Sequence, residues 1–308
     1  MNVVMAKSVY RAAYRLAGWS LDHVGPLSPH LRTYARRVRN RMQSTSFYAA
    51  LPNPAHVDGF RLHHDGQASV NVNALIMGMF EPETTQLFKR MLAPGMTVID
   101  VGANVGYYSL LAAQAIGSTG HVWAFEPVPS TVALIHKSVD DNGCADRIQV
   151  CPCAVGASAG TARIYLGPED SGTSNLFIPH TEYVDVPVTT LDTWAAAQGW
   201  PTVDVVKMDI EGAERDALQG MPELSRRNPQ MRLIVEFNPT TMQAAGVTAD
   251  EFFTVLQSRG FDRIALIGKK VCRLDLASDI PRLVREARRR GNVNLLCEKE
   301  GATTCEVA

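Results

Sequence analysis

The sequence contains no apolar run of the roughly 18 to 20 residues that a helix needs to cross a lipid bilayer. It also lacks the secretory pattern of a basic start, an apolar segment and a small-residue cleavage site. The 46% hydrophobic and 20% charged residues are typical of a globular domain with an ample core. These absences favour a cytoplasmic protein over a secreted or membrane-spanning one.

The chain has no large excess of either charge, because its formal net charge is −1. A general nucleic-acid binder would present a basic surface, so we expect no nucleic-acid partner. The cysteines lack the spacing of zinc knuckles and redox motifs. Cys151 and Cys153 form C-x-C, and for them buried free thiols are favoured over metal ligands. The six cysteines are Cys144, Cys151, Cys153, Cys272, Cys297 and Cys305.

Basic residues are concentrated at the N-terminus. Residues 1–42 hold eight lysines and arginines against one aspartate. Lys7, Arg11 and Arg15 recur every four residues, which places them on one face of a helix. We predict a basic, partly helical extension over residues 1–56. It either packs on the catalytic core or makes peripheral contact with the inner face of a membrane.

A glycine turn between a strand and a helix is the most informative local pattern. Val98 to Val101 is typical of a buried parallel strand, and the apolar stretch Tyr107 to Ile116 predicts a helix. Gly102 and Gly106 bracket the turn that joins them. His121 to Phe125 then predicts a second strand. Glu126 follows that strand, where an acid accepts hydrogen bonds from ribose hydroxyls.

Two nucleotide-like cofactors compete for this turn. A dinucleotide site requires G-x-G-x-x-G and a pyrophosphate over the helix N-terminus, but the third glycine is missing here. Asp100, at the end of the first strand, would repel a pyrophosphate. The same carboxylate suits the positively charged methionine part of S-adenosylmethionine. The methyl donor is therefore favoured over a nicotinamide cofactor.

Three further segments extend this pattern. Lys207-Met-Asp-Ile-Glu-Gly-Ala-Glu214 follows a buried strand, Leu191-Asp192 lies within T-L-D, and the strand from Leu233 ends in Glu236-Phe-Asn238. With D-x-G-A-N-x-G and F-E-P, these segments resemble the FkbM family of S-adenosylmethionine-dependent methyltransferases over roughly Val57 to Glu298. The resemblance implies methyl transfer to a hydroxyl, on a sugar of a glycolipid or polysaccharide or on a secondary metabolite.

Strand and helix patterns alternate along the chain, which predicts an α/β domain over residues 57–298 with a mainly parallel sheet and helices on both faces. The last strand, Val293 to Cys297, is expected to run antiparallel beside its neighbour, before a tail over 299–308. The resemblance implies that this is the Rossmann-like class I methyltransferase fold. Phe60 to His64 and Ala68 to Leu75 are expected to form a hairpin around Asp65-Gly66.

The chemistry of methyl transfer assigns expected roles to these residues. A neutral hydroxyl is a poor nucleophile, so a base must take its proton. Carboxylates at strand ends are better placed for this than His63, His64 and His180. The expected catalytic residues are Asp209, Glu211 and Glu236. The expected cofactor residues are Asp100, Gly102, Asn104, Gly106, Glu126, Pro127 and Ala154, and the expected substrate residues are Ser174, Asn175 and Asn238.

Two matters stay open at this point. Asp209, Glu211 and Glu236 offer hard oxygen ligands, so a divalent metal such as magnesium is an alternative or additional role for them. Besides the methyltransferase hypothesis, a nicotinamide-dependent oxidoreductase and a non-catalytic lipid- or protein-binding module on the same fold are the alternatives. The sequence indicates neither the acceptor nor the oligomeric state, because acceptor pockets are built from variable loops.

Overall fold

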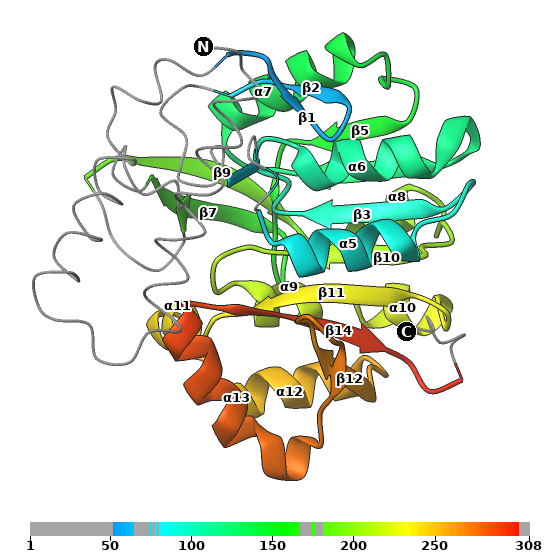
Figure 1. Cartoon of the computed structure of the whole chain (residues 1–308). Coiled ribbons are helices and arrows are strands. Elements are labelled where there is room, and N and C mark those ends of the chain that lie inside the picture. The colour runs from blue at the N-terminus through cyan, green and yellow to red at the C-terminus, as the bar shows by residue number, and fades with distance from the viewer. Residues whose placement is uncertain are drawn as a thin grey trace, which may run out of the picture.

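The computed structural model describes residues 52–64, 74–75, 78, 80–166, 174–175 and 181–301 (Figure 1). The predicted basic helix near the N-terminus, with Lys7, Arg11 and Arg15, lies outside the described residues. Among the helices in the described ranges, none is long and apolar enough to cross a membrane.

A sheet of eight strands forms the centre of the molecule, in the order β13-β12-β14-β11-β10-β3-β4-β5. The five strands from β11 to β5 are parallel, and β14 runs antiparallel between β11 and β12. The predicted Rossmann-like class I fold with an antiparallel last strand is therefore confirmed. The strands are β3 (Thr97–Val101), β4 (His121–Phe125), β5 (Ile148–Cys151), β10 (Val205–Met208), β11 (Arg232–Phe237), β12 (Arg263–Leu266), β13 (Cys272–Arg273) and β14 (Val293–Glu298).

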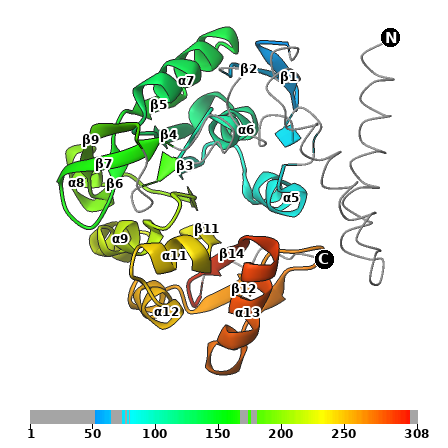
Figure 2. The same ribbon diagram turned by 90° about the vertical axis from the view of Figure 1, so that its left-hand side faces the viewer.

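Helices cover both faces of the sheet, as Figure 2 shows from its end. One buried cluster joins the sheet to α5 (Pro82–Met91), α6 (Tyr107–Ala115) and α7 (Pro129–Asp141). The helices that contribute to the cluster on the other face are α8 (Leu191–Ala197), α9 (Glu214–Gln219), α10 (Pro222–Arg227), α11 (Pro239–Ala244), α12 (Ala249–Ser258) and α13 (Leu276–Arg290). A short 3-10 helix (Gly117–Thr119) precedes β4.

Alternation along the strands assigns the side chains to these two faces. In β10, Val206 and Met208 belong to the cluster with α8 to α13, whereas Val205 belongs to the other one. Lys207 therefore faces α5 and α6, and the same alternation places Asp100 of β3 and Glu236 of β11 on that face. Ionisable side chains thus cross three neighbouring strands on one side of the sheet.

A smaller sheet is inserted between β5 and α8, with the strand order β6-β9-β7-β8. It contains the two added strands predicted near residues 161–166 and 184–189. Its hydrophobic contacts involve Val128, Ala154, Ile164 and Val186. Its strands are β6 (Ala154–Val155), β7 (Gly160–Leu166), β8 (Ser174–Asn175) and β9 (Tyr183–Thr189).

Most of the hairpin predicted around Asp65-Gly66 lies outside the described residues. Phe60–Leu62 (β2) pairs with the preceding segment Ala55–Val57 (β1), and the turn between them is Asp58-Gly59. Both turn residues have positive φ, 49° and 91°, which aspartate and glycine tolerate. Residues 65–73 lie outside the described ranges, and Ala74 and Leu75 are helical rather than extended. β1 spans the predicted boundary between residues 56 and 57.

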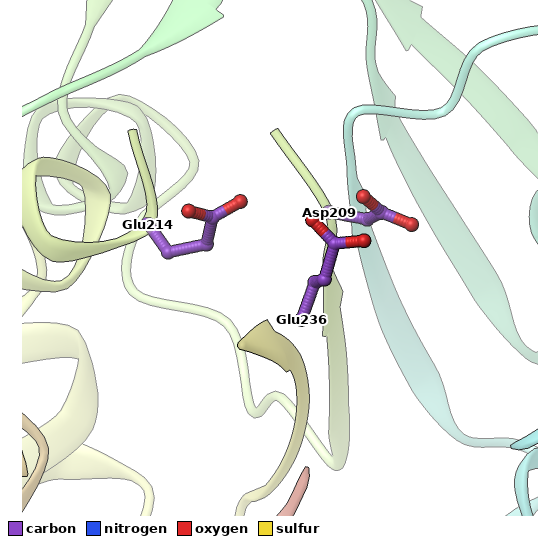
Figure 3. A group of neighbouring side chains, drawn as sticks. All are labelled: Asp209, Glu214 and Glu236. Atoms are coloured by element: carbon purple, nitrogen blue, oxygen red, sulfur yellow. The ribbon is translucent and has the colours of Figure 1, made fainter. Parts of the chain in front are cut away.

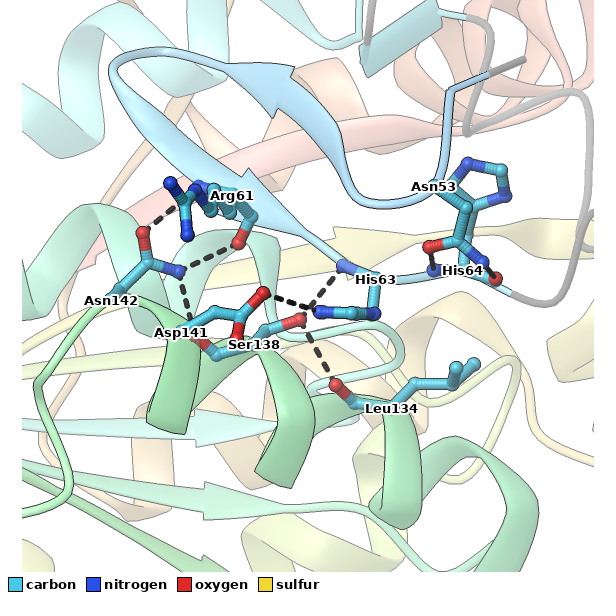
Figure 4. A network of polar contacts seen from close by, with 8 residues as sticks. All are labelled: Asn53, Arg61, His63, His64, Leu134, Ser138, Asp141 and Asn142. Atoms are coloured by element: carbon cyan, nitrogen blue, oxygen red, sulfur yellow. Dashed lines mark hydrogen bonds and ion pairs between the residues drawn. The ribbon is translucent and has the colours of Figure 1, made fainter.

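The hairpin is fastened to α7 by polar contacts (Figure 4). The backbone N–H of His63 donates to Ser138 Oγ at 2.9 Å, and the His63 ring lies 2.8 Å from Asp141 Oδ2. The Nε2 atom of His64 contacts the Pro52 carbonyl at 3.1 Å. These two imidazoles therefore make contacts that hold the hairpin and its neighbouring segments in place.

A substitution of Gly102, at the end of β3, tests the close packing at the centre of the sheet. Its φ is +82°, and a Cβ added there would lie 2.0 Å from the Asp209 carbonyl oxygen. Gly143 also has a positive φ, +58°, but no atom lies within 4 Å of its added Cβ. We expect Gly143→Ala to cost about 1 to 2 kcal/mol for the left-handed backbone. Gly102→Ala should cost clearly more, because the clash is with backbone. Urea denaturation measures both, and equal losses would contradict the close contact.

Candidate active site

The glycine turn and three acidic segments meet at the carboxyl ends of β3, β4, β10 and β11. β3 lies between β4 and β10, and β11 follows β10. The chain passes from β3 to β4 and β5 on one side and returns to β10 on the other. A strand order that reverses in this way opens a crevice at the carboxyl edge, where α/β proteins bind ligands.

The glycine turn is held against both neighbouring strands. The backbone N–H groups of Gly102 and Ala103 donate to the Phe125 carbonyl at 3.0 and 2.9 Å. On the other side, Gly102 lies against the Asp209 carbonyl, where no side chain fits. Asn104 and Gly106 also have positive φ, 49° and 87°, and Gly106 caps the N-terminus of α6. The position of the turn is therefore fixed by both neighbouring strands, and Asn104 is its exposed residue.

Glu126 is aligned by two backbone amides. Its Oε2 accepts a hydrogen bond from Asn104 N–H and its Oε1 one from Val128 N–H, both at 2.9 Å. The residue is buried, and burial raises the pKa of its carboxyl to about 7 even though both amides lower it. A carboxylate oxygen has a second lone pair, so each oxygen can still accept a hydroxyl. This geometry suits the expected bonds to a ribose.

Asp100 lies deeper than expected for a group that contacts the cofactor directly. It is 2% exposed, and Ser109 Oγ on α6 donates to its Oδ2 at 2.6 Å. Burial raises the pKa of this carboxyl to about 6, against the lowering effect of Ser109 and of the positive charge on Lys207. Asp100 thus links β3 to α6 beneath the turn, and its predicted role at the methionine end of the cofactor stays a prediction.

Three carboxylates come together at the ends of β10 and β11. One oxygen from each of Asp209, Glu214 and Glu236 lies within 4.8 Å of the others. Figure 3 shows Glu214 reaching from α9 toward the other two side chains. Register explains one of these approaches, because Met208 pairs with Val235 and the next residues of both strands are Asp209 and Glu236. The predicted set contained Glu211 in place of Glu214.

Glu214 was assigned no role by the sequence, although it belongs to the same motif as Asp209 and Glu211. Its Oε1 and Oε2 accept from the amides of Ile210 and Gly212, both at 2.9 Å. These bonds shape the loop between β10 and α9. Burial raises the pKa of Glu214 to about 7 although the amides lower it. The sequence signal that could have identified Glu214 is a carboxylate three residues after Glu211, which lies in a tight turn.

Glu211 lies at the tip of that loop. Its φ is 54°, and it is partly exposed. Burial of its carboxyl, followed by the negative charges on Asp209 and Glu214, raises its pKa to about 8. Asp209 is bound differently, because the buried Lys207 ammonium lies 3.2 Å from its Oδ2. Lys207 therefore pairs with one of the motif acids.

Glu236 is 2% exposed and points from β11 into this acidic group. Its Oε1 accepts a hydrogen bond from the side-chain amide of Asn292, and its Oε2 is buried without a partner among the described residues. Burial, together with the charges of Asp209 and Glu211, raises its pKa well above the ordinary value. Asn292 was not predicted, because it precedes the last strand and carries no local motif.

The remaining expected residues occupy more structural positions. Asn238 caps α11, since its Oδ1 accepts from Thr240 N–H at 3.1 Å. Pro127 follows Glu126 directly, and Ala154 begins β6. Ser174 and Asn175 form β8 beside β7; the structure describes their backbone only. His180 lies outside the described residues.

Asp192 of the T-L-D segment also has a structural position. Its two carboxylate oxygens accept from the amides of Glu223 and Leu224 at 2.9 and 2.7 Å. Asp192 therefore caps the start of α10, and this motif acid does not belong to the acidic group at the carboxyl edge.

The model of the Methyltransferase FkbM domain matches residues 100–263 of the chain, from the end of β3 to the start of β12. The chain belongs to the FkbM methyltransferase family. It is accordingly an S-adenosylmethionine-dependent methyltransferase, which sets aside the nicotinamide-dependent alternative. The matched range contains the glycine turn, Glu126 and the three-carboxylate cluster.

Similar proteins carry related descriptions. The 31-O-demethyl-FK506 methyltransferase FkbM of Streptomyces tacrolimicus is 27% identical over 206 residues, which cover 56% of this chain and 75% of that protein. Methyltransferase sdnD of Sordaria araneosa is 23% identical over 197 residues, covering 54% and 73%. The structure of an O-methyltransferase from Bacillus cereus in complex with SAH superposes with a TM-score of 0.42 at 10% identity, covering 92% of this chain and 95% of that one.

Glu126→Gln tests the environment of the buried Glu126 carboxylate. The pKa of Glu126 rises from 4.5 to about 7 on folding, so between these values the folded protein holds a proton that the unfolded chain releases. The contribution of Glu126 to stability therefore falls as the pH rises through that window, by up to about 3 kcal/mol. We expect the free energy of unfolding of ligand-free wild type, measured in urea, to fall relative to that of the variant between about pH 5 and 8. Parallel curves would show an ordinary pKa for Glu126.

Proposed function

We propose that this methyltransferase transfers the methyl group of S-adenosylmethionine to a hydroxyl oxygen of an acceptor. The observation that carries the proposal is the position of the glycine turn, which lies directly beside Asp209 at the end of β10 and holds Glu126 on its other side through the Asn104 amide. One end of this crevice suits a ribose and the other can take a proton. An O-methyl transfer needs both functions within the reach of one cofactor.

In this proposal Glu126 accepts hydrogen bonds from the ribose hydroxyls of the cofactor. Its two oxygens are fixed by amides of the glycine turn and of the segment before α7, and each keeps a lone pair for a hydroxyl. The turn from Gly102 to Gly106, in which Asn104 is exposed, then lies along the methionine part of the cofactor. Negative charge from Asp100 and Asp209 favours the sulfonium and the ammonium there.

In this proposal Glu211 is the base that takes the proton of the acceptor hydroxyl. The other three motif carboxylates are engaged, since Asp209 is paired with Lys207, Glu214 with two amides and Glu236 with Asn292. Within the part of the chain that the structure describes, Glu211 makes no such hydrogen bond and is partly exposed, so its oxygens are free to meet an acceptor hydroxyl. When the hydroxyl oxygen attacks the methyl carbon, the carbon–sulfur bond breaks and the proton moves to the carboxylate.

The acceptor class rests on the resemblance and on one relative. The similar protein of Streptomyces tacrolimicus is a methyltransferase of 31-O-demethyl-FK506. We extend this to a hydroxyl on a secondary metabolite or on a sugar of a glycolipid or polysaccharide. Location in the cytoplasm, at the inner face of the membrane where the acceptor is a glycolipid, is part of the same proposal.

Calorimetric titration with S-adenosylhomocysteine and, separately, with NAD tests the cofactor site. We expect micromolar affinity for S-adenosylhomocysteine and none for NAD. Glu126→Ala should abolish the first while the circular dichroism spectrum stays that of the wild type. Unchanged affinity in this variant would remove Glu126 from the ribose, and binding of neither ligand by the wild type would favour the non-catalytic alternative.

Methyl-labelled S-adenosylmethionine and a panel of glycolipids and macrolide alcohols test the reaction. We expect a labelled product whose NMR spectrum shows an O–CH3 group. With the acceptor so identified, Glu211→Gln should lower turnover by about 10² to 10⁴-fold, because the base is lost, and should leave the affinity for S-adenosylhomocysteine unchanged. Glu223→Gln, at an exposed carboxylate that pairs with Arg226 and Arg227, is the matched control. Turnover close to normal in Glu211→Gln would show that another group takes the proton of the acceptor hydroxyl.

A further inference from the structure

The cluster of Asp209, Glu214 and Glu236 contains more negative charge than the described residues around it neutralise. Its one ion pair within the described ranges is the contact of Asp209 with Lys207. Lys207 is also shared, because the carboxylates of Glu81 and Asp100 act on the same ammonium. Glu214 and Glu236 are 1% and 2% exposed, so water screens them poorly.

An orphaned oxygen points to what the cluster lacks. Glu236 Oε2 is buried and has no hydrogen-bond donor among the described residues, while Oε1 of the same carboxylate is bound by Asn292. A buried polar atom without a partner is uncommon in folded proteins and calls for a specific explanation. This oxygen belongs to the carboxylate that faces Asp209 and Glu214 in Figure 3, and one oxygen of that carboxylate lies within 4.8 Å of an oxygen of each of the other two.

Each carboxylate is also anchored from outside the cluster. Lys207 binds Asp209 through Oδ2, and the amides of Ile210 and Gly212 bind Glu214. Asn292 supplies the corresponding bond to Glu236. Outer donors of this kind orient the ligands of metal sites and keep one lone pair of each carboxylate directed inward. The three carboxylates are thus held in place before any cation arrives.

We propose that Asp209, Glu214 and Glu236 bind one divalent cation of the hard, oxygen-preferring class, to which magnesium and manganese belong. Their ligand oxygens lie within 4.8 Å of one another, a spacing that a single ion bonded to all three at about 2.0 to 2.5 Å can span. The assignment goes beyond the proposed methyl transfer. It differs from the set expected from sequence, because Glu214 replaces Glu211 and leaves the latter free.

Electron paramagnetic resonance of added Mn²⁺ tests the site without any use of activity. The signal of free Mn²⁺ falls when the ion binds, so a titration of the full chain gives both stoichiometry and affinity. We expect one ion per chain with submillimolar affinity, displaced by excess Mg²⁺. Glu236→Gln should weaken this binding by at least about tenfold, and Asp209→Asn should do the same.

Glu298→Gln is the matched control. Glu298 is also buried on a strand of the same sheet, and its Oε1 also lacks a partner among the described residues, but it lies outside the cluster. This variant should bind Mn²⁺ as the wild type does. Absence of binding by the wild type at millimolar Mn²⁺, or equal affinity in the wild type and both cluster variants, would overturn the proposal. Titration with S-adenosylhomocysteine in a chelator separates this result from the cofactor site, which does not require the ion.

Discussion

The close approach of two backbones, at Gly102 and Asp209, is the constraint on which the rest of the site depends. β3 and β10 are parallel neighbours with Val101 opposite Met208, so the two loops that follow them leave the sheet side by side. One loop carries the cofactor turn and the other the acidic motif. They touch because Gly102 has no side chain, and a Cβ there would overlap the Asp209 carbonyl oxygen. This contact brings the glycine turn and the acidic motif together at one edge of the sheet.

Buried charge is the second organising element. Asp100, Lys207 and Glu236 lie on one face of three adjacent strands, under α5 and α6. The Lys207 ammonium lies 5.0 Å from the centre of the Tyr108 ring, and Tyr108 donates to Glu81 at 2.7 Å. The network holds the acidic motif in place, but it leaves negative charge in excess. Such an arrangement suits ligands that carry positive charge, as a sulfonium does.

The sequence predicted those parts of the molecule whose signals are local. β4 and β5 have the predicted bounds, and the helix after the glycine turn ends within one residue of its predicted end. Two Asp-Gly dipeptides lie seven residues apart and both satisfy the turn chemistry, so the sequence did not single out the turn at Asp58-Gly59 that joins β1 to β2. Which strand pairs with β2 is decided by packing on α7, through contacts such as His63 with Ser138 that no local pattern reveals.

The same limit applies to the site. Glu126 and the glycine turn could be found because their motif is contiguous, whereas the contact between Asn292 and Glu236 joins residues 56 positions apart. The position of β14 has a consequence for synthesis. This strand follows every other described element in the chain, yet it lies between β11 and β12 and hydrogen-bonds to both. A nascent chain on the ribosome therefore exposes two unpaired strand edges until β14 emerges, and such edges invite association with other chains. Glu236 acquires its Asn292 partner only at that last stage. The pairing of β14 therefore covers the exposed edges of β11 and β12 and, at the same time, completes the acidic cluster.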